Sequence, residues 1–333
     1  MEALSGRRVD RPALQFNYSP VGFYEHGEAL NDLYDKYHGD FEAFTRKPIP
    51  KPPAGAIDTD GRYFERITDD WGVTQEYRVY GIMGHTVDYP VKTALDAANY
   101  LFPPLPAYIN KPDEYRAAIN HAKTDYYVFG NGGGILERMW AIRGYENTMM
   151  DLAEDTPEIN LLMDRLTEYY RVQVEKAVDA GVDGVAFGDD YGTQNGLMLS
   201  RDTFRHALKP RLARMMEPAR KAGLHIHFHS CGLVSDLFED FRDLGVSSIW
   251  PQLPLYDMRE LKRALDFYKF SIAIHTDRAG IMTSGTPEAV REAVLLENEI
   301  FRPKDGGAWF YIEADTGFPL ENISALLETA YGL

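Results

Sequence analysis

Short apolar segments alternate with amphipathic segments from about residue 125 to the end of the chain. In the stretches between the apolar segments, apolar residues recur with the spacing of an amphipathic helix. Three of these predicted helices begin at residues that favour capping, namely Thr156, Ser200 and Thr286. Alternation of this length predicts a parallel sheet, either a closed barrel or an open doubly wound sheet. The predicted strands cover residues 126–131, 183–190, 224–231, 246–252, 270–277 and 308–315.

Polar residues mark the carboxyl ends of these predicted strands. A barrel gathers all its strand ends around one mouth, whereas an open sheet concentrates its site at one or two strand ends. The spread over six strands therefore favours an α/β fold with a single (β/α)8 TIM barrel. The polar residues are Asn131, Asp189, Asp190, His229, Cys231, Gln252, His275, Asp277, Glu313 and Asp315.

The first part of the chain is less regular. Residues 62–67 and 74–81 flank the segment TDDWGV and predict a β-hairpin, with Asp69 and Asp70 as turn residues. The segment 45–58 is rich in proline and basic residues, which predicts an extended loop and not a linker between domains. We therefore expect residues 1–333 to form one domain, with residues 1–65 as a divergent N-terminal extension of the barrel.

Composition and charge narrow the function classes. The formal net charge of −16 would repel a polyanion, so we expect no nucleic-acid partner. No apolar run is long enough to span a bilayer, and the start lacks the apolar core of a signal peptide, so we expect neither membrane insertion nor export. A single cysteine cannot form a disulfide within the chain. Proteins of the reducing cytoplasm typically lack disulfides, so we expect a cytoplasmic protein.

The stretch LHIHFHSC, residues 224–231, places three histidines at every second position and ends in that cysteine. Side chains alternate faces along a strand, so His229 and Cys231 share the face that points into the barrel mouth. Zinc binds imidazole nitrogen, thiolate sulphur and carboxylate oxygen, and Glu313 or Asp315 would supply a third ligand. The other interpretation is a set of hydrogen-bonded core histidines, which we favour for the deeper His225 and His227.

Other charged residues leave two interpretations open. Asp189 and Asp190 at one strand end are either acid/base and substrate-anchoring groups or a helix cap. A cap needs only one acid, which favours a functional role for the pair. The charges of Glu137 and Arg143 in LERMWAIRGYE are either a buried ion pair or mouth residues.

Five segments in a fixed order resemble the uroporphyrinogen decarboxylase superfamily. They are LERMWAIRGYE (136–146), FGDDYGTQ (187–194), HSCG (229–232), GTPEAVREAV (285–294) and GGAWFYIEADTGFPLENI (306–323). The resemblance covers most of the chain after about residue 65 and implies a (β/α) barrel. The decarboxylases of the superfamily carry an R-Q-A-G-R stretch and an F-S-D-I motif, and neither occurs here.

The resemblance to the cobalamin-dependent methyltransferases of this superfamily implies a zinc held by His229, Cys231 and Glu313. It implies a methyl transfer from a small methoxy or methylamine substrate to a corrinoid. The chain lacks a D-x-H-x-x-G cobalamin signature, so the corrinoid would come from a separate protein. We expect Asp190, Gln194 and His275 to be catalytic, and the substrate to be bound by Asn131, Asp189, Asp277 and Tyr311.

Two other functions stay open from the sequence. The first is a metal-free decarboxylase acting on a porphyrinogen or a smaller acid, and the second is a non-catalytic barrel that binds a tetrapyrrole or corrinoid. Metal content separates the methyltransferase from both, and turnover separates the decarboxylase from the binding protein. The sequence leaves the assembly undecided, with a homodimer open.

Overall fold

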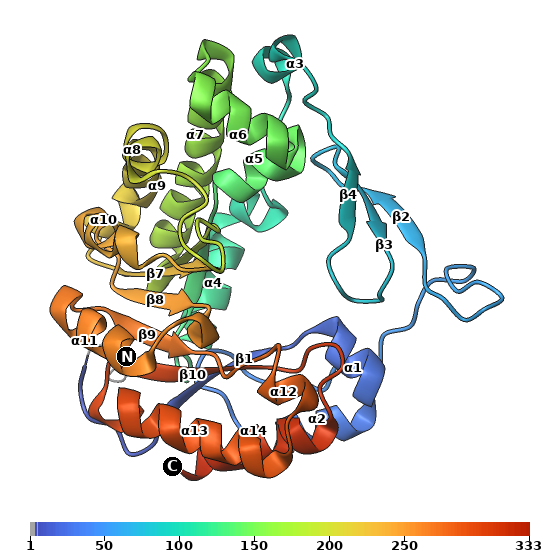
Figure 1. The fold of residues 1–333 in the computed structure, drawn as a ribbon, viewed down its shortest axis with the longest axis vertical. Coiled ribbons are helices and arrows are strands. Elements are labelled where there is room, and N and C mark those ends of the chain that lie inside the picture. Colours follow the sequence, from blue (N-terminus) through green and yellow to red (C-terminus); the bar gives the residue numbers. More distant parts are fainter. Residues whose placement is uncertain (1–3, 5) are drawn as a thin grey trace.

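Seven parallel strands form a curled sheet at the centre of the molecule (Figure 1). The computed structural model describes residue 4 and residues 6–333. The strand order is β1-β10-β9-β8-β7-β6-β5, so the first strand of the chain pairs with the last, as it does in a barrel. This sheet confirms the predicted strand–helix alternation. The strands are β1 (Ala13–Asn17), β5 (Phe129–Gly133), β6 (Gly184–Gly188), β7 (His225–Ser230), β8 (Ser248–Pro251), β9 (Ser271–Ile274) and β10 (Ala308–Glu313).

The sheet does not close into the predicted (β/α)8 barrel. Among the described residues, no strand lies between the edge strands β1 and β5. Asp40 bridges this gap near the amino end of the sheet, where its N–H donates to the Leu14 carbonyl (2.8 Å) and its own carbonyl accepts from Tyr127 (2.9 Å). The prolines of the following segment, KPIPKPPAG, have no N–H to donate to a strand ladder, which is a physical reason for the missing strand.

The two faces of each strand pack in different environments, as the sequence period of two predicts. On β7, Ile226 and Phe228 belong to the outer core beneath the helices. The alternate residue His227 points inward, where its ring lies 5.3 Å from that of Trp309. A separate inner cluster, which includes Trp309 and Tyr311, fills the curl of the sheet.

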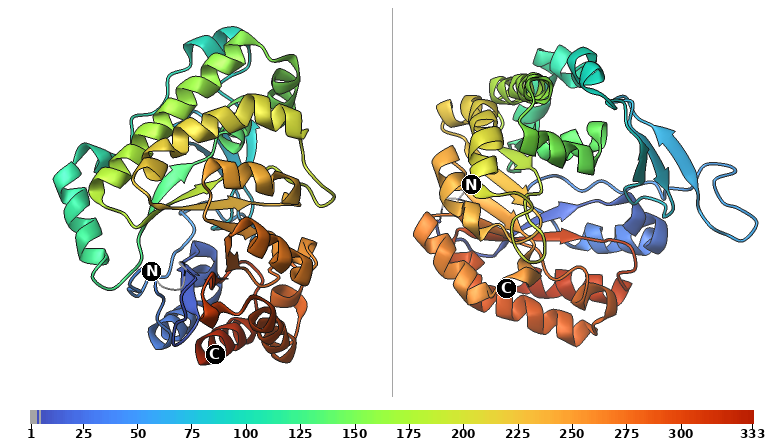
Figure 2. Two further views of the ribbon diagram at one scale, coloured as in Figure 1. Left: turned by 90° about the vertical axis from the view of Figure 1, so that its left-hand side faces the viewer. Right: turned by 45° about the horizontal axis from the view of Figure 1, so that its top comes forward.

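Helices cover the outside of the curled sheet (Figure 2). The predicted caps are confirmed, because the hydroxyls of Thr156, Ser200 and Thr286 each accept a hydrogen bond from the N–H three residues later. The described helices lack the combined length and apolarity that a membrane crossing requires. They are α1 (Pro20–His26), α2 (Glu28–Lys36), α3 (Ala94–Asn99), α4 (Pro112–Ala122), α5 (Leu136–Arg143), α6 (Tyr145–Glu154), α7 (Pro157–Ala180), α8 (Arg201–Thr203), α9 (Lys209–Lys221), α10 (Phe238–Leu244), α11 (Met258–Tyr268), α12 (Ile281–Ser284), α13 (Pro287–Phe301) and α14 (Leu320–Gly332).

A small antiparallel sheet stands apart from the parallel one, as Figure 1 shows. It consists of β2 (Glu65–Thr68), β3 (Thr74–Tyr77) and β4 (His85–Asp88). The predicted hairpin is therefore confirmed, and Asp69 is a turn residue whose carboxylate accepts hydrogen bonds from the N–H groups of Trp71 (3.0 Å) and Val73 (2.9 Å). This turn fixes the position of Trp71.

Glu297 makes the stability of the fold depend on pH. Its side chain lies in α13, is 4% exposed, and accepts a hydrogen bond from the Thr276 hydroxyl (2.7 Å). Burial raises the pKa of Glu297 from 4.5 to about 8, so the folded protein retains a proton that the unfolded chain releases between these values. Stability therefore falls as the pH rises through this window, by up to about 1 kcal/mol for each pH unit.

We expect Glu297→Gln to remove this dependence, because an amide is neutral at every pH in the window. In urea unfolding, the variant should exceed the wild type in stability near pH 8 and match it near pH 4.5. Glu299→Gln, an exposed position on the same helix, is the control and should show no such trend. A constant difference between the Glu297 variant and the wild type at both pH values would contradict the assignment.

Candidate metal centre

Three potential metal ligands meet at the carboxyl ends of two neighbouring strands. Asp190 follows β6, and His229 and Cys231 lie at the end of β7, which pairs with β6 in register at Gly188 and His229. One ligand atom from each of the three lies within 4.8 Å of the others. His229 Nε2 lies 3.4 Å from Cys231 Sγ and 3.7 Å from Asp190 Oδ1. The shared strand face predicted for His229 and Cys231 therefore brings these two side chains together. Asp190 reaches them because β6 pairs with β7.

The imidazole of His229 is oriented for ligation. Its Nδ1 lies 2.9 Å from the Trp250 carbonyl and donates a hydrogen bond to it, which leaves the lone pair of Nε2 directed toward Cys231. The His229 ring also packs on the Trp250 ring, with a centroid separation of 4.1 Å. Burial lowers the pKa of His229, which favours the neutral imidazole that a metal ion requires.

The thiol of Cys231 needs a cation to ionise. Burial and the neighbouring Asp190 carboxylate together raise the pKa of Cys231 to about 12. A free thiolate is therefore disfavoured at neutral pH, and a divalent ion at the three ligands would offset this cost. Imidazole, thiol and carboxylate form a ligand set that suits zinc, with room for a fourth ligand.

Glu313, the third ligand expected from the family resemblance, is not part of this group of three. Its Oε1 contacts His275 Nε2 (3.2 Å) and Arg278 Nε (3.3 Å), and its Oε2 accepts a hydrogen bond from Asn17 (3.3 Å). Burial opposes the charged form of Glu313, but the contacts with His275 and Arg278 hold its pKa below the usual value. Asp190, and not Glu313, is thus the carboxylate that lies with His229 and Cys231.

A chain of contacts links Glu313 to the candidate ligands. The indole Nε1 of Trp250 donates to His275 Nδ1 (3.3 Å), so the remaining proton of His275 lies on Nε2 and faces Glu313. The backbone carbonyl of the same Trp250 holds His229. Both ring nitrogens of His275 are therefore occupied, one by Trp250 and the other by Glu313.

Asp189 and Asp190 have different environments although they are adjacent. Asp189 is fully buried, and its carboxylate accepts hydrogen bonds from the N–H groups of Ile135, Leu136 and Glu137 at 2.7–2.9 Å. Burial raises the pKa of Asp189 to about 6, although these hydrogen bonds oppose the shift. The carboxylate is therefore committed to the start of α5, and only Asp190 faces the mouth.

The remaining residues expected at the site lie in several positions. Asn131 is exposed in the middle of β5, and Gln194 is exposed on the loop after β6. Asp277 accepts hydrogen bonds from the N–H groups of Ala279 (3.1 Å) and Gly280 (3.0 Å) at the start of α12. Tyr311 lies beneath the mouth, with its ring 4.1 Å from that of Trp250.

The deeper histidines are hydrogen-bonded core residues. His225 Nε2 and His227 Nδ1 lie 2.7 Å and 2.8 Å from the same Ser248 hydroxyl. Burial lowers the pKa of both rings, so they are neutral at physiological pH. This arrangement agrees with the structural role favoured for these two residues.

The open interpretation of Glu137 and Arg143 is resolved, because they do not pair. Arg143 binds Asp151 (2.8 Å), whereas Glu137 lines a cavity of about 770 Å³ beside the mouth. Arg278, which contacts both Glu313 and Asp315 at the mouth, was not among the residues expected from the sequence. Its position directly after the strand-end residue Asp277 was the available signal.

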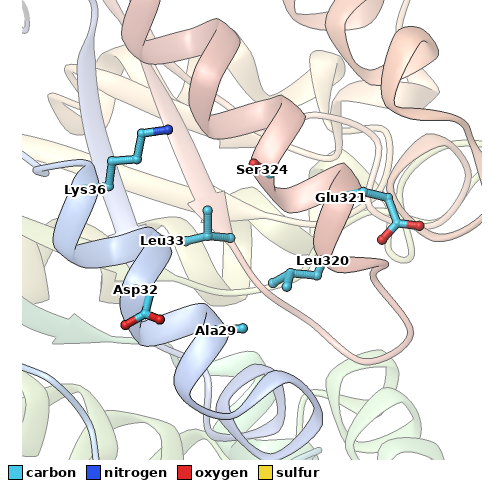
Figure 3. A pocket seen from close by; sticks show the side chains of 7 residues that line it. All are labelled: Ala29, Asp32, Leu33, Lys36, Leu320, Glu321 and Ser324. Carbon is cyan, nitrogen blue, oxygen red and sulfur yellow. The ribbon is translucent and has the colours of Figure 1, made fainter.

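A groove on the outer surface lacks the histidine and cysteine side chains that gather at the mouth. It lies between α2 and α14 and has a volume of about 540 Å³ (Figure 3). The groove is lined by Ala29, Asp32, Leu33, Lys36, Leu320, Glu321 and Ser324. The mouth is therefore the better candidate for a site of reaction.

The curled parallel sheet and its polar mouth define a class of α/β proteins related to the (β/α) barrels. The chain belongs to the uroporphyrinogen decarboxylase (URO-D) family, whose model matches residues 87–330. No curated protein sequence matches the chain.

Two solved structures are similar to this chain to different extents. A methyltransferase from Methanosarcina mazei is similar over 98% of this chain and 96% of that chain, with a TM-score of 0.66 and 15% identity. At this identity the likeness shows the fold. A GH10 endoxylanase from a sugarcane soil metagenome matches 66% of this chain and 81% of that chain, with a TM-score of 0.42 and 8% identity.

Proposed function

We propose that this protein is a zinc-dependent methyltransferase that moves a methyl group from a small methoxy or methylamine substrate to a corrinoid protein. The observation that carries the proposal is the meeting of His229, Cys231 and Asp190 at the mouth. These residues would hold the zinc, which would act as a Lewis acid on the substrate heteroatom and make it a better leaving group. The similarity in fold to a methyltransferase supports the proposal.

The surrounding residues would hold the ligands in one geometry. Trp250 fixes the ring of His229 through its carbonyl and that of His275 through its indole. Glu313 and Arg278 would then hold the far side of His275. Such contacts behind the ligands keep a metal site organised, and their loss typically weakens metal affinity or activity about 10–100-fold.

The name of the family supports a second candidate, a decarboxylase without a metal. A porphyrinogen with many carboxylates would need unpaired cations at the mouth. Arg278, which follows β9 in the chain, already contacts the carboxylates of Glu313 and Asp315. This pairing leaves fewer cations at the mouth than a substrate with many carboxylates would need, which favours the methyltransferase.

The test is methyl transfer to free cobalamin reduced to Co(I), followed by its visible spectrum. With a panel of methoxy and methylamine compounds, the zinc-loaded protein should convert Co(I) to methyl-Co(III) with at least one donor. His229→Ala should lower the rate by roughly 100-fold or more, because the site loses a ligand. His121→Ala, an exposed position on α4, is the matched control and should retain the rate.

A different result would replace the proposal. Release of carbon dioxide from uroporphyrinogen at a rate that is insensitive to His229→Ala and to chelators would establish the decarboxylase. Absence of both reactions, with tight binding of a corrinoid or tetrapyrrole, would favour the non-catalytic alternative.

A further inference from the structure

The cavity beside the mouth combines aromatic walls with polar groups. It lies between the antiparallel sheet and the helices α5 and α7, and it reaches Gly188 at the end of β6. Its aromatic residues include Trp71, Tyr77 and Tyr169, and its amides include Asn131 and Gln173. Its volume of about 770 Å³ is within the range of sites that bind small molecules.

Arg138 presents a fixed cation to this cavity. The centre of its guanidinium lies 4.2 Å from the centroid of the Trp71 ring, and its Nε donates to the Tyr170 hydroxyl (3.2 Å). Trp71 is itself packed against Tyr169, with a centroid separation of 5.2 Å. Stacking on one side and a hydrogen bond on another hold the guanidinium in one plane.

The terminal nitrogens of Arg138 have no acceptor among the residues that the structure describes. The hydrogen bond from Nε uses one of the five N–H groups of the guanidinium, so four remain for a ligand. By contrast, Arg143 binds Asp151 and Arg211 binds Asp164. An immobilised guanidinium with free terminal N–H groups suits the two oxygens of a carboxylate.

Two acidic residues of the cavity do not provide that partner. Asp69 Oδ1 accepts hydrogen bonds from the N–H groups of its own turn. Glu137 lines the same cavity, but no salt bridge joins its carboxylate to Arg138 in the part of the chain that the structure describes.

The cavity adjoins the candidate metal centre. Glu137 and Gly188 both line the cavity: the N–H of Glu137 donates to Asp189 (2.7 Å), which precedes Asp190, and Gly188 pairs with His229 in the sheet. A ligand anchored at Arg138 would thus extend past Glu137 toward the three potential metal ligands. The aromatic walls favour a flat organic group between these two ends.

We propose that Arg138 binds the carboxylate of a planar organic acid, so that the methyl-donating substrate is an anion anchored beside the metal centre. The position of the anchor rests on the geometry of the cavity. The statement that its ligand donates a methyl group rests on the proposed function.

The test compares benzoate with benzamide, which has the same shape without the charge, by calorimetric titration of the zinc-loaded protein at constant ionic strength. Benzoate should bind more tightly than benzamide. Arg138→Met should weaken benzoate binding roughly tenfold or more and leave benzamide binding unchanged, because only the carboxylate uses the guanidinium. Arg138→Lys keeps a cation over Trp71 but loses the two-pronged donor, so it should give an intermediate affinity.

Two controls keep the test decisive. Thermal unfolding of both variants shows whether each is folded, and Arg138→Lys serves if the methionine variant is not. Arg278→Met tests the other mouth cation and should weaken benzoate binding less than Arg138→Met does. Equal binding of benzoate by wild type and Arg138→Met, or loss of binding only in Arg278→Met, would overturn the proposal.

The outcomes separate this proposal from the proposed function. Binding of benzoate through Arg138 without any methyl transfer would retain the anion site and reject the methyltransferase. With an active methyl donor, Arg138→Met should raise KM for acidic donors and leave KM for neutral donors unchanged. Methyl transfer from acidic donors that is insensitive to Arg138→Met would retain the methyltransferase and reject this anchor.

Discussion

Zinc binding should be lost when His229 is replaced by alanine, Cys231 by serine or Asp190 by asparagine. The three donors lie within 4.8 Å of one another, so each variant removes one of the three proposed protein ligands. Glu313→Gln should retain zinc, because this carboxylate contacts His275, Arg278 and Asn17 and is not in the cluster. Metal analysis of the purified proteins after loading with zinc gives the stoichiometry directly.

The comparison of two carboxylates makes this prediction discriminating. We expect the affinity of the Asp190 variant for zinc to fall roughly 100-fold or more, and that of the Glu313 variant to fall by about tenfold or less. The reverse order would restore Glu313 as the third ligand and would exclude the arrangement in the structure. A wild-type protein that stays metal-free after zinc loading would exclude the whole ligand set.

Asp189→Ala should destabilise the protein by about 3 kcal/mol or more. The buried carboxylate accepts hydrogen bonds from three backbone N–H groups at the start of α5 and one from the Tyr191 hydroxyl (2.8 Å). Alanine would leave four donors without a partner in a site that water does not reach. Urea unfolding of the metal-free protein measures the loss.

Asp190→Ala is the matched control for this second prediction. Asp190 accepts one backbone hydrogen bond, from Cys231 (2.6 Å), and lies at the partly exposed mouth. Its replacement should cost the metal-free protein less than half as much stability as Asp189→Ala, while removing zinc. Equal destabilisation by the two variants would show that the adjacent acids do not have the separate roles described above.

Much of the architecture follows from local sequence. The period of two in residues 224–231 separates Ile226 and Phe228 from the inward histidines, because a strand turns alternate side chains to opposite faces. The caps at Thr156, Ser200 and Thr286 depend on residues only three positions away, so they are equally readable. The strand β1 was missed, because the few residues Ala13–Asn17 carry too little pattern to distinguish a strand from a loop.

The sequence by itself therefore determined the strand–helix alternation, the inward face of β7 and the pairing of His229 with Cys231. Tertiary structure decided the third donor, because Asp190 reaches Cys231 only through the register of β6 against β7. It also decided that Asp189 is a buried cap, and that Arg138 is held on Trp71 beside the mouth. These contacts join residues that are 41–67 positions apart in the chain, so local spacing does not encode them, whereas alternation and capping act over a few residues.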